Sequence, residues 1–99
     1  MESVHIANTS DIPAGEGKVF NAKGKAIAIF NVDGKFYAID NTCKHQGGPL
    51  GDGFLDENIV TCPWHGWQYD VTTGKSISTP VHVTSYKLKV ENSKILVDI

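Results

Sequence analysis

The sequence predicts an all-β fold, a sandwich or small barrel built from seven to ten short antiparallel strands. Short segments rich in β-branched and aromatic residues recur along the chain, separated by clusters of Gly, Asn, Asp and Pro. Helical periodicity is scarce, and Asp33-Gly34 is a strong two-residue hairpin signal between two apolar segments. With 99 residues, 40% of them hydrophobic, the chain is expected to form a single domain over residues 1–99.

Three strands are expected in the first half of the chain. Val4 and Ile6 alternate with polar neighbours, and the Pro- and Gly-containing stretch 10–17 interrupts this run. Residues 26–30 are apolar and β-branched, and the chain returns from the Asp33-Gly34 turn through residues 35–39.

Loops and short strands alternate in the second half. Residues 41–53 are rich in Gly, Asn, Asp and Pro and are expected to form a loop. Strands are expected at 59–61, 68–71, 86–90 and 95–97, turns at 72–75 and 92–93, and an extended or loop segment containing Pro80 at 76–84. In the strand at 86–90, Tyr86, Leu88 and Val90 are expected on one face and Lys87 and Lys89 on the other.

Charge and composition exclude several functional classes. The formal net charge of −2 argues against nucleic-acid binding, which usually needs a basic excess. No apolar run approaches the roughly 20 residues needed to span a bilayer, and the N-terminus has neither the basic nor the apolar region of a secretory signal. We therefore expect a soluble, cytoplasmic protein without nucleic-acid or membrane partners.

Two short motifs contain both cysteines of the chain: Cys43-Lys44-His45 and, after sixteen intervening residues, Cys62-Pro63-Trp64-His65. Each motif offers one thiolate and one imidazole, so the four side chains suit either a tetrahedral zinc ion or a mixed-ligand iron–sulfur cluster. The repeated Cys-then-His order differs from the usual zinc spacing, in which a Cys pair precedes a His pair. A disulfide between Cys43 and Cys62 would not need a histidine beside each cysteine, so the two histidines favour a metal site over a disulfide.

These motifs resemble the two ligand loops of the Rieske family, in residues 43–50 and 62–70, and the resemblance extends to Thr73-Gly74-Lys75 and Pro80. It implies a 2Fe–2S cluster held by a two-loop subdomain at the tip of the fold, with loops at about 41–53 and 62–70. It also implies that Cys43 and Cys62 hold the buried iron and that His45 and His65 hold the outer one.

The resemblance also implies roles for residues around the cluster. Gly47, Gly48 and Gly66 either let backbone N–H groups approach the sulfurs or simply form tight turns. Pro80 corresponds to a third loop that covers the cluster. The high-potential branch has an extra cysteine in each loop, and here Gly48 or a neighbour and Trp64 stand at those places.

Three aromatic residues of the second loop are candidates for roles at the site. Tyr69 either donates its hydroxyl to Cys43 or a bridging sulfide, or is an ordinary strand aromatic. Trp67 stands where the high-potential branch has a serine that donates to the cluster. Trp64 is expected to be exposed and, with Lys44, to contribute to a docking surface, whereas Trp67 is expected to be at least partly buried.

The function that follows from the resemblance is one-electron transfer at low to intermediate potential. The chain is expected to relay electrons from a flavin-dependent reductase to a terminal oxidoreductase, such as a ring-hydroxylating dioxygenase or mono-oxygenase. It shows no nucleophile, general base or open metal position, so no substrate turnover is expected. The alternatives are a small Rieske subunit of a nitrite-reductase-like enzyme and a zinc-stabilised interaction module.

Residues outside the two motifs have simpler expected roles. His5 and His82 have no cysteine at ligand spacing, so both are expected on the surface or on an edge strand. Asp52, Asp56 and Glu57 are expected in a solvated turn, with a basic reductase as an alternative contact.

Overall fold

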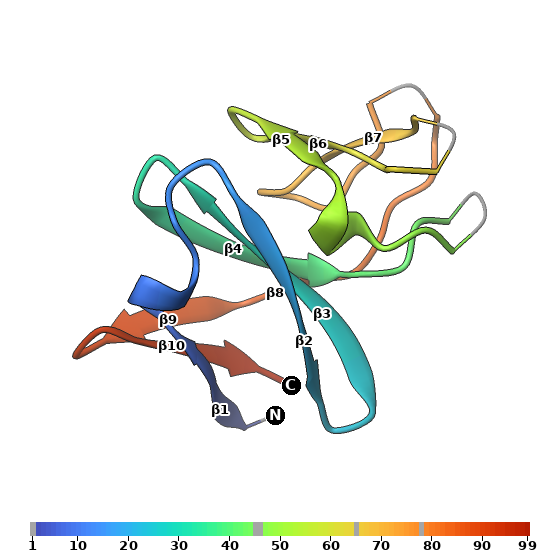
Figure 1. Cartoon of the computed structure of the whole chain (residues 1–99). Coiled ribbons are helices and arrows are strands. Elements are labelled where there is room, and N and C mark those ends of the chain that lie inside the picture. Colours follow the sequence, from blue (N-terminus) through green and yellow to red (C-terminus); the bar gives the residue numbers. More distant parts are fainter. Residues whose placement is uncertain (1, 45–46, 65, 78) are drawn as a thin grey trace.

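The computed structural model describes residues 2–44, 47–64, 66–77 and 79–99. Within them the fold is all-β, and every strand pairing is antiparallel. Three sheets have the strand orders β1-β10-β9, β2-β3-β4-β8 and β5-β6-β7 (Figure 1). The strands are β1 (Ser3–Asn8), β2 (Gly17–Ala22), β3 (Lys25–Val32), β4 (Lys35–Asp40), β5 (Phe54–Asp56), β6 (Ile59–Thr61), β7 (Gln68–Asp70), β8 (Ser85–Tyr86), β9 (Leu88–Glu91) and β10 (Lys94–Asp98).

The sheet β2-β3-β4-β8 is covered on both faces. Side chains alternate along its central strands, so each strand contributes residues to a core on either side of the sheet. Ala28 and Phe30 of β3 pack into one core, while Ile27 and Ile29 pack into the other. Burial on both faces explains why β3 has a nearly continuous apolar run instead of a polar–apolar alternation.

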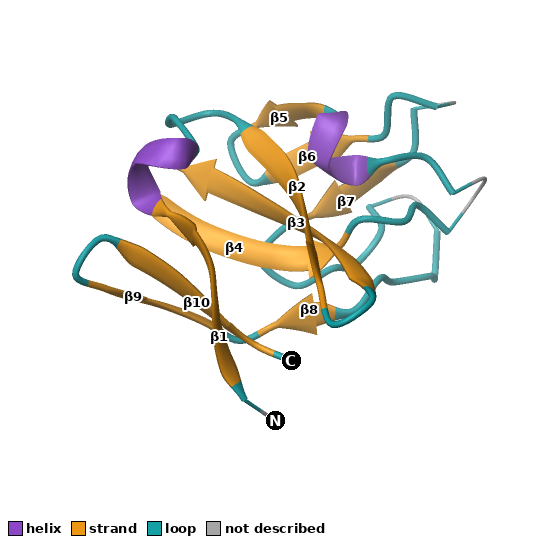
Figure 2. Cartoon of the chain, turned by 60° about the horizontal axis from the view of Figure 1, so that its bottom comes forward, coloured by secondary structure: helices purple, strands orange, loops and turns teal. Residues whose placement is uncertain are grey.

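One core lies between this central sheet and the sheet β1-β10-β9, at the end of the molecule that holds both termini (Figure 2). The other core lies under β5-β6-β7, and it contains both cysteines and Tyr69. The third sheet and the loops that extend from it are at the opposite end from the termini (Figure 1); we refer to β5-β6-β7 with residues 41–53 and 62–84 as the loop-bearing end.

Several sequence predictions are confirmed. The turn at Asp33-Gly34 has positive φ at both residues, as a type I′ hairpin turn requires. The same holds at Asn92-Ser93, and β6 spans the predicted residues 59–61. Within 76–84 the described residues, 76–77 and 79–84, form no strand, and the bridges Tyr69↔Ser76 and Lys75↔His82 hold this segment.

Three predictions about strands were wrong. The predicted interruption holds for residues 10–16, but strand β2, which begins at Gly17, was not predicted. Phe30 lies directly opposite Gly17, and a Cβ at residue 17 would come within 2.5 Å of its ring. The predicted loop 41–53 contains a short 3-10 helix at Leu50–Asp52 and is followed by strand β5, which the sequence did not reveal. The predicted strand 86–90 is divided, since β8 pairs with β4 while β9 pairs with β10, and Val90 is exposed.

None of the helices in the described part of the chain has the length and apolar character that a membrane span requires.

Candidate metal centre

The two cysteines lie at the bases of two loops that leave the central and third sheets. Cys43 follows β4, and a tight loop returns to it: the Cys43 N–H donates to the Gly48 carbonyl at 3.0 Å, and the Gly47 N–H donates to the Cys43 carbonyl at 2.9 Å. Cys62 follows β6 directly, and its N–H donates to the Trp67 carbonyl at 2.7 Å. Both cysteines are buried thiols, 2% exposed, and they belong to one apolar core.

Asn41 fixes the base of the first loop. Its N–H donates to the Ala26 carbonyl of β3 at 3.0 Å, its carbonyl accepts from the Leu50 N–H at 2.7 Å, and its Oδ1 accepts from the Gly51 N–H at 2.7 Å. Because Asn41 is buried, these bonds have little competition from water. Asn41 was not predicted as a site residue, since one asparagine in a polar segment carries no distinguishing signal.

Polar hydrogens approach both sulfurs. The Trp64 N–H donates to Cys62 Sγ at 3.4 Å, and the Tyr69 hydroxyl lies 3.5 Å from Cys43 Sγ. The Tyr69 oxygen also accepts the Lys44 N–H at 3.1 Å, which leaves its own hydrogen available to the sulfur. Sulfur atoms that receive such bonds are suited to the thiolate state, in which sulfur binds metal.

Tyr69 is fully buried at the centre of this arrangement. Burial raises the pKa of Tyr69 to about 12, with a further increase from the hydrogen bond to Cys43, while the Lys44 N–H acts in the opposite direction. Tyr69 therefore stays protonated at neutral pH and remains a hydrogen-bond donor.

Burial also raises the pKa of the Cys62 thiol; the Trp64 N–H lowers it, and the nearby Cys43 raises it further. The buried Cys62 thiol therefore resists ionisation beside Cys43, and a bound metal ion would reverse this because coordination stabilises the thiolate. The backbone at Gly48 leaves room for these sulfurs, since a Cβ there would lie 2.6 Å from Cys62 Sγ and 3.1 Å from Trp64 Cβ. The described residues thus fit the sulfur side of a metal cluster.

The remaining predicted site residues surround this core at the loop-bearing end. Trp64 is half exposed, whereas Trp67 is partly buried and packs on the cysteine-containing core, as the sequence predicts. The exposed members of the predicted set are Lys44, Gly47, Gly66 and Pro80, and Gly48 is buried. The predicted ligands His45 and His65 lie outside the described residues.

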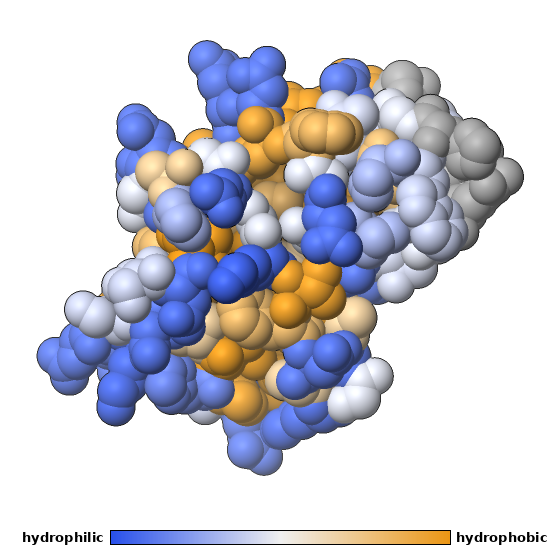
Figure 3. Space-filling view, in the orientation of Figure 1, coloured by the Kyte–Doolittle hydropathy of each residue, from blue (hydrophilic) through white to orange (hydrophobic). Residues whose placement is uncertain are grey.

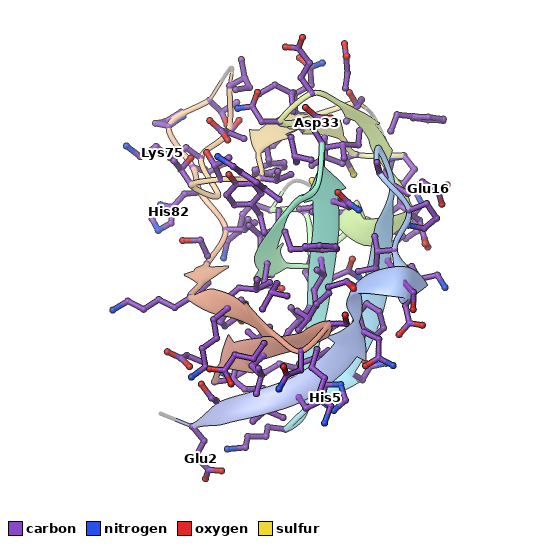
Figure 4. The ribbon with its side chains drawn as sticks, turned by 90° about the vertical axis from the view of Figure 1, so that its left-hand side faces the viewer. Glu2, His5, Glu16, Asp33, Lys75 and His82 are labelled. Carbon is purple, nitrogen blue, oxygen red and sulfur yellow. The ribbon has the colours of Figure 1, made fainter. Side chains whose placement is uncertain are left out.

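The other two histidines are on the surface. His5 is exposed on edge strand β1, and His82 is exposed in the segment after β7, on the same side of the molecule as Lys75 (Figure 4). Both placements confirm the prediction of surface histidines.

Comparison with known proteins connects this geometry to a family. Residues 2–91 match the Rieske [2Fe-2S] domain. The ferredoxin component of the naphthalene 1,2-dioxygenase/salicylate 5-hydroxylase systems of a Ralstonia species is 37% identical over 95 residues, covering 94% of this chain and 91% of that protein.

Solved structures show the same fold. A ferredoxin from Sphingomonas yanoikuyae B1 superposes with a TM-score of 0.91 at 27% identity, covering 99% of both chains. A chain from the complex of reduced oxygenase and oxidised ferredoxin in carbazole 1,9a-dioxygenase superposes with a TM-score of 0.88 at 30% identity, covering 96% of this chain and 91% of that one.

The chain belongs to the Rieske [2Fe-2S] domain family. Its cofactor is a 2Fe–2S cluster, not the zinc ion that the donor types alone also allowed. Within the family it is a Rieske-type ferredoxin, a one-electron carrier of an oxidoreductase system and not the component that transforms the substrate.

Proposed function

We propose that Cys43, His45, Cys62 and His65 ligate the cluster, in a single domain over residues 1–99 whose ligand loops are 41–53 and 62–70. The observation that supports this most is the pair of buried sulfurs from two loops, each approached by a polar hydrogen from Trp64 or Tyr69. The two histidines follow their cysteines at two and three positions in the sequence, so each loop supplies one thiolate and one imidazole.

The cluster supplies a one-electron redox centre, and neutral imidazole ligands place such centres at about −150 to +300 mV. The residues of the chain tune and protect this centre. The Tyr69 hydroxyl and the Trp64 N–H stabilise negative charge on the sulfurs, and the surrounding apolar core excludes water from them. We assign Gly47, Gly48, Gly66, Trp67 and Pro80 to the packing of the loops around the cluster, and Trp64 and Lys44 to the surface that meets partners.

The partners we propose are a flavin-dependent reductase as electron donor and a terminal ring-hydroxylating oxygenase as acceptor, in the cytoplasm. The Ralstonia relative is a component of naphthalene dioxygenase and salicylate hydroxylase systems. A ferredoxin 30% identical to this chain occurs in a complex with its oxygenase. Both support a mobile carrier that serves an oxygenase.

Ligand substitution tests the metal centre. Cys43→Ser and His65→Ala are expected to abolish the rhombic electron paramagnetic resonance signal of the reduced protein and to lower its content of iron and acid-labile sulfide. His5→Ala is the matched control, because His5 is exposed on edge strand β1, in the sheet that holds the termini, and it is expected to keep a full cluster. A normal spectrum in either ligand variant would contradict the ligand set.

Electron transfer tests the function independently of the ligands. The purified holoprotein is expected to accept electrons from a flavin reductase and to pass them to the terminal oxygenase of the Ralstonia naphthalene dioxygenase system in single-turnover mixing. Failure of the reduced holoprotein to reduce that oxygenase would contradict the proposed acceptor class.

A further inference from the structure

The outer face of the β5-β6-β7 sheet carries exposed apolar side chains. Along these strands Leu55, Val60 and Tyr69 point inward, so their neighbours Phe54, Thr61 and Gln68 point outward and lie beside one another in the strand register. Phe54 is 74% exposed, and Ile77, whose N–H donates to the Gln68 carbonyl, is 54% exposed. Figure 3 shows apolar atoms at the surface over β5, beside hydrophilic ones.

Phe54 stands between two hollows in this surface. A hollow of about 330 Å³ is lined by Ile59 and Ile77 together with Asp56 and Glu57. On its other side, Phe54 borders a hollow of about 370 Å³ that includes Glu16 and Asp52. An exposed aromatic side chain flanked by hollows has the shape of a protein-contact anchor, since aromatic residues are enriched in the cores of interfaces.

The charge around Phe54 has one sign. The two hollows are lined by the four carboxylates Glu16, Asp52, Asp56 and Glu57, and no lysine lines either of them in the part of the chain that the structure describes. The rest of the chain has nine lysines and seven carboxylates, so the negative charge is concentrated here. Figure 4 shows Glu16 and Asp33 well apart from Lys75, which lies on the other side of the molecule.

We propose that this surface, the acidic lateral face (Phe54, Ile59 and Ile77 with Asp52, Asp56 and Glu57), docks the electron acceptor of the chain, through an apolar recess rimmed by lysine or arginine on the acceptor. The proposal rests on the oxygenase acceptor of the proposed function. A second copy of this chain does not fit, because a symmetric dimer would bring the two acidic rims together.

The negative charge of this face favours the acceptor over the donor as its partner. Taking up one electron adds a negative charge to the ferredoxin, so a basic partner binds the reduced form more tightly than the oxidised one. This preference suits the acceptor, which must bind the reduced ferredoxin and release it after the electron has left. A basic donor would instead retain its product.

Binding measurements test the acidic lateral face. The reduced and oxidised holoproteins are titrated with the terminal oxygenase of the Ralstonia naphthalene dioxygenase system, and dissociation constants and association rates are measured at several salt concentrations. Phe54→Ser is expected to weaken binding about tenfold, as removal of an interface anchor does. The double variant Asp56→Asn with Glu57→Gln is expected to slow association and to reduce its salt dependence.

The matched controls lie on β9, in the sheet that holds the termini. Val90→Ser removes an exposed apolar side chain and Glu91→Gln an exposed carboxylate, and both are expected to leave binding unchanged. All variants must keep the visible spectrum of the cluster. If wild type binds the oxygenase and the Phe54 and acidic variants bind it equally tightly, the inference about this face is wrong while the proposed function stands. The same holds if these substitutions slow reduction by the reductase more than they weaken binding to the oxygenase. Absence of wild-type binding would contradict the acceptor class itself.

Discussion

Tyr69 joins strand β7 to the first loop through a single hydroxyl. It comes from β7, accepts the N–H of Lys44 in the first loop and lies next to Cys43 Sγ. The sequence left two interpretations of this residue, a donor to the cluster or an ordinary strand aromatic. The structure combines them, since the ring fills the core while the hydroxyl reaches the sulfur.

Tyr69→Phe is expected to lower the reduction potential of the holoprotein. The variant keeps the ring but removes a donor that stabilises the more negative, reduced state. A net hydrogen-bond contribution of about 0.5–1.5 kcal/mol corresponds to about 20–60 mV for one electron. Protein-film voltammetry measures the shift, and Tyr86→Phe on β8 is the control, because it makes the same chemical change at a residue that packs against the core without cysteines. Equal potentials for wild type and Tyr69→Phe would show that the hydroxyl does not act on the cluster.

Gly48→Ala is expected to make the cluster labile, because the added methyl group would lie 2.6 Å from Cys62 Sγ and would push the two loops apart. The rate of loss of visible absorbance in the presence of an iron chelator measures this effect. Gly24→Ala is the control: Gly24 has a φ of +75° and open space around its Cβ position, so its substitution strains a turn without contacting the loops. Equally fast loss in both variants would indicate general destabilisation instead of loop displacement.

At the scale of elements, the sequence predicts best where one local signal decides the structure. Asp33-Gly34 adopts the positive φ values that a two-residue hairpin needs, and β6 has the predicted bounds. The fold class and the two cysteine-containing loops follow from the motifs. Strand β2 was missed because a glycine such as Gly17 is typical of a break between strands. The glycine is explained only by the ring of Phe30, which lies opposite Gly17 across the sheet. Asn41 was missed for a similar reason, since its three partners come together only in the fold.

The turn after β7 depends on a carboxylate. Asp70 Oδ1 accepts the Thr72 N–H at 2.9 Å and the Thr72 hydroxyl at 2.6 Å. Partial burial acts to raise the pKa of Asp70, but hydrogen bonds from Thr72 and Asn58 outweigh it and leave this pKa below its usual value. This turn leads the chain from β7 into the segment that contains Pro80.

Asp70→Asn is therefore expected to lower the free energy of unfolding by about 1–2 kcal/mol at pH 7. Because the pKa of Asp70 is lower in the folded state, its contribution is complete above the pKa of the unfolded chain and is lost as the pH falls through the folded-state value. The difference between wild type and variant should thus shrink between pH 7 and acidic pH in urea titrations of the holoprotein. The exposed carboxylate in Asp56→Asn is the control, and a difference that grows in acid would contradict the assignment.

The whole molecule consists of two cores that share the central sheet. The core near the termini contains Ile27, Ile29, Ile95 and Val97 and no cysteine. The other core contains Cys43, Cys62 and Tyr69, under a sheet whose three strands have only three residues each. Such short strands have few ladder hydrogen bonds, so the loop-bearing end depends more on its metal than the other end does.

Removal of the cluster is expected to loosen one end of the molecule selectively. In hydrogen–deuterium exchange of apoprotein against holoprotein, the amides of β6 and β7 should lose protection, because cluster binding contributes part of the folding free energy there. The amides of β3 and β10 that face the other core should stay protected, since Ile29 and Ile95 pack in a core that contains no cluster ligand. Uniform loss of protection in all strands would mean that the two cores unfold as one cooperative unit, and the sheet β2-β3-β4-β8 would then couple them instead of separating them.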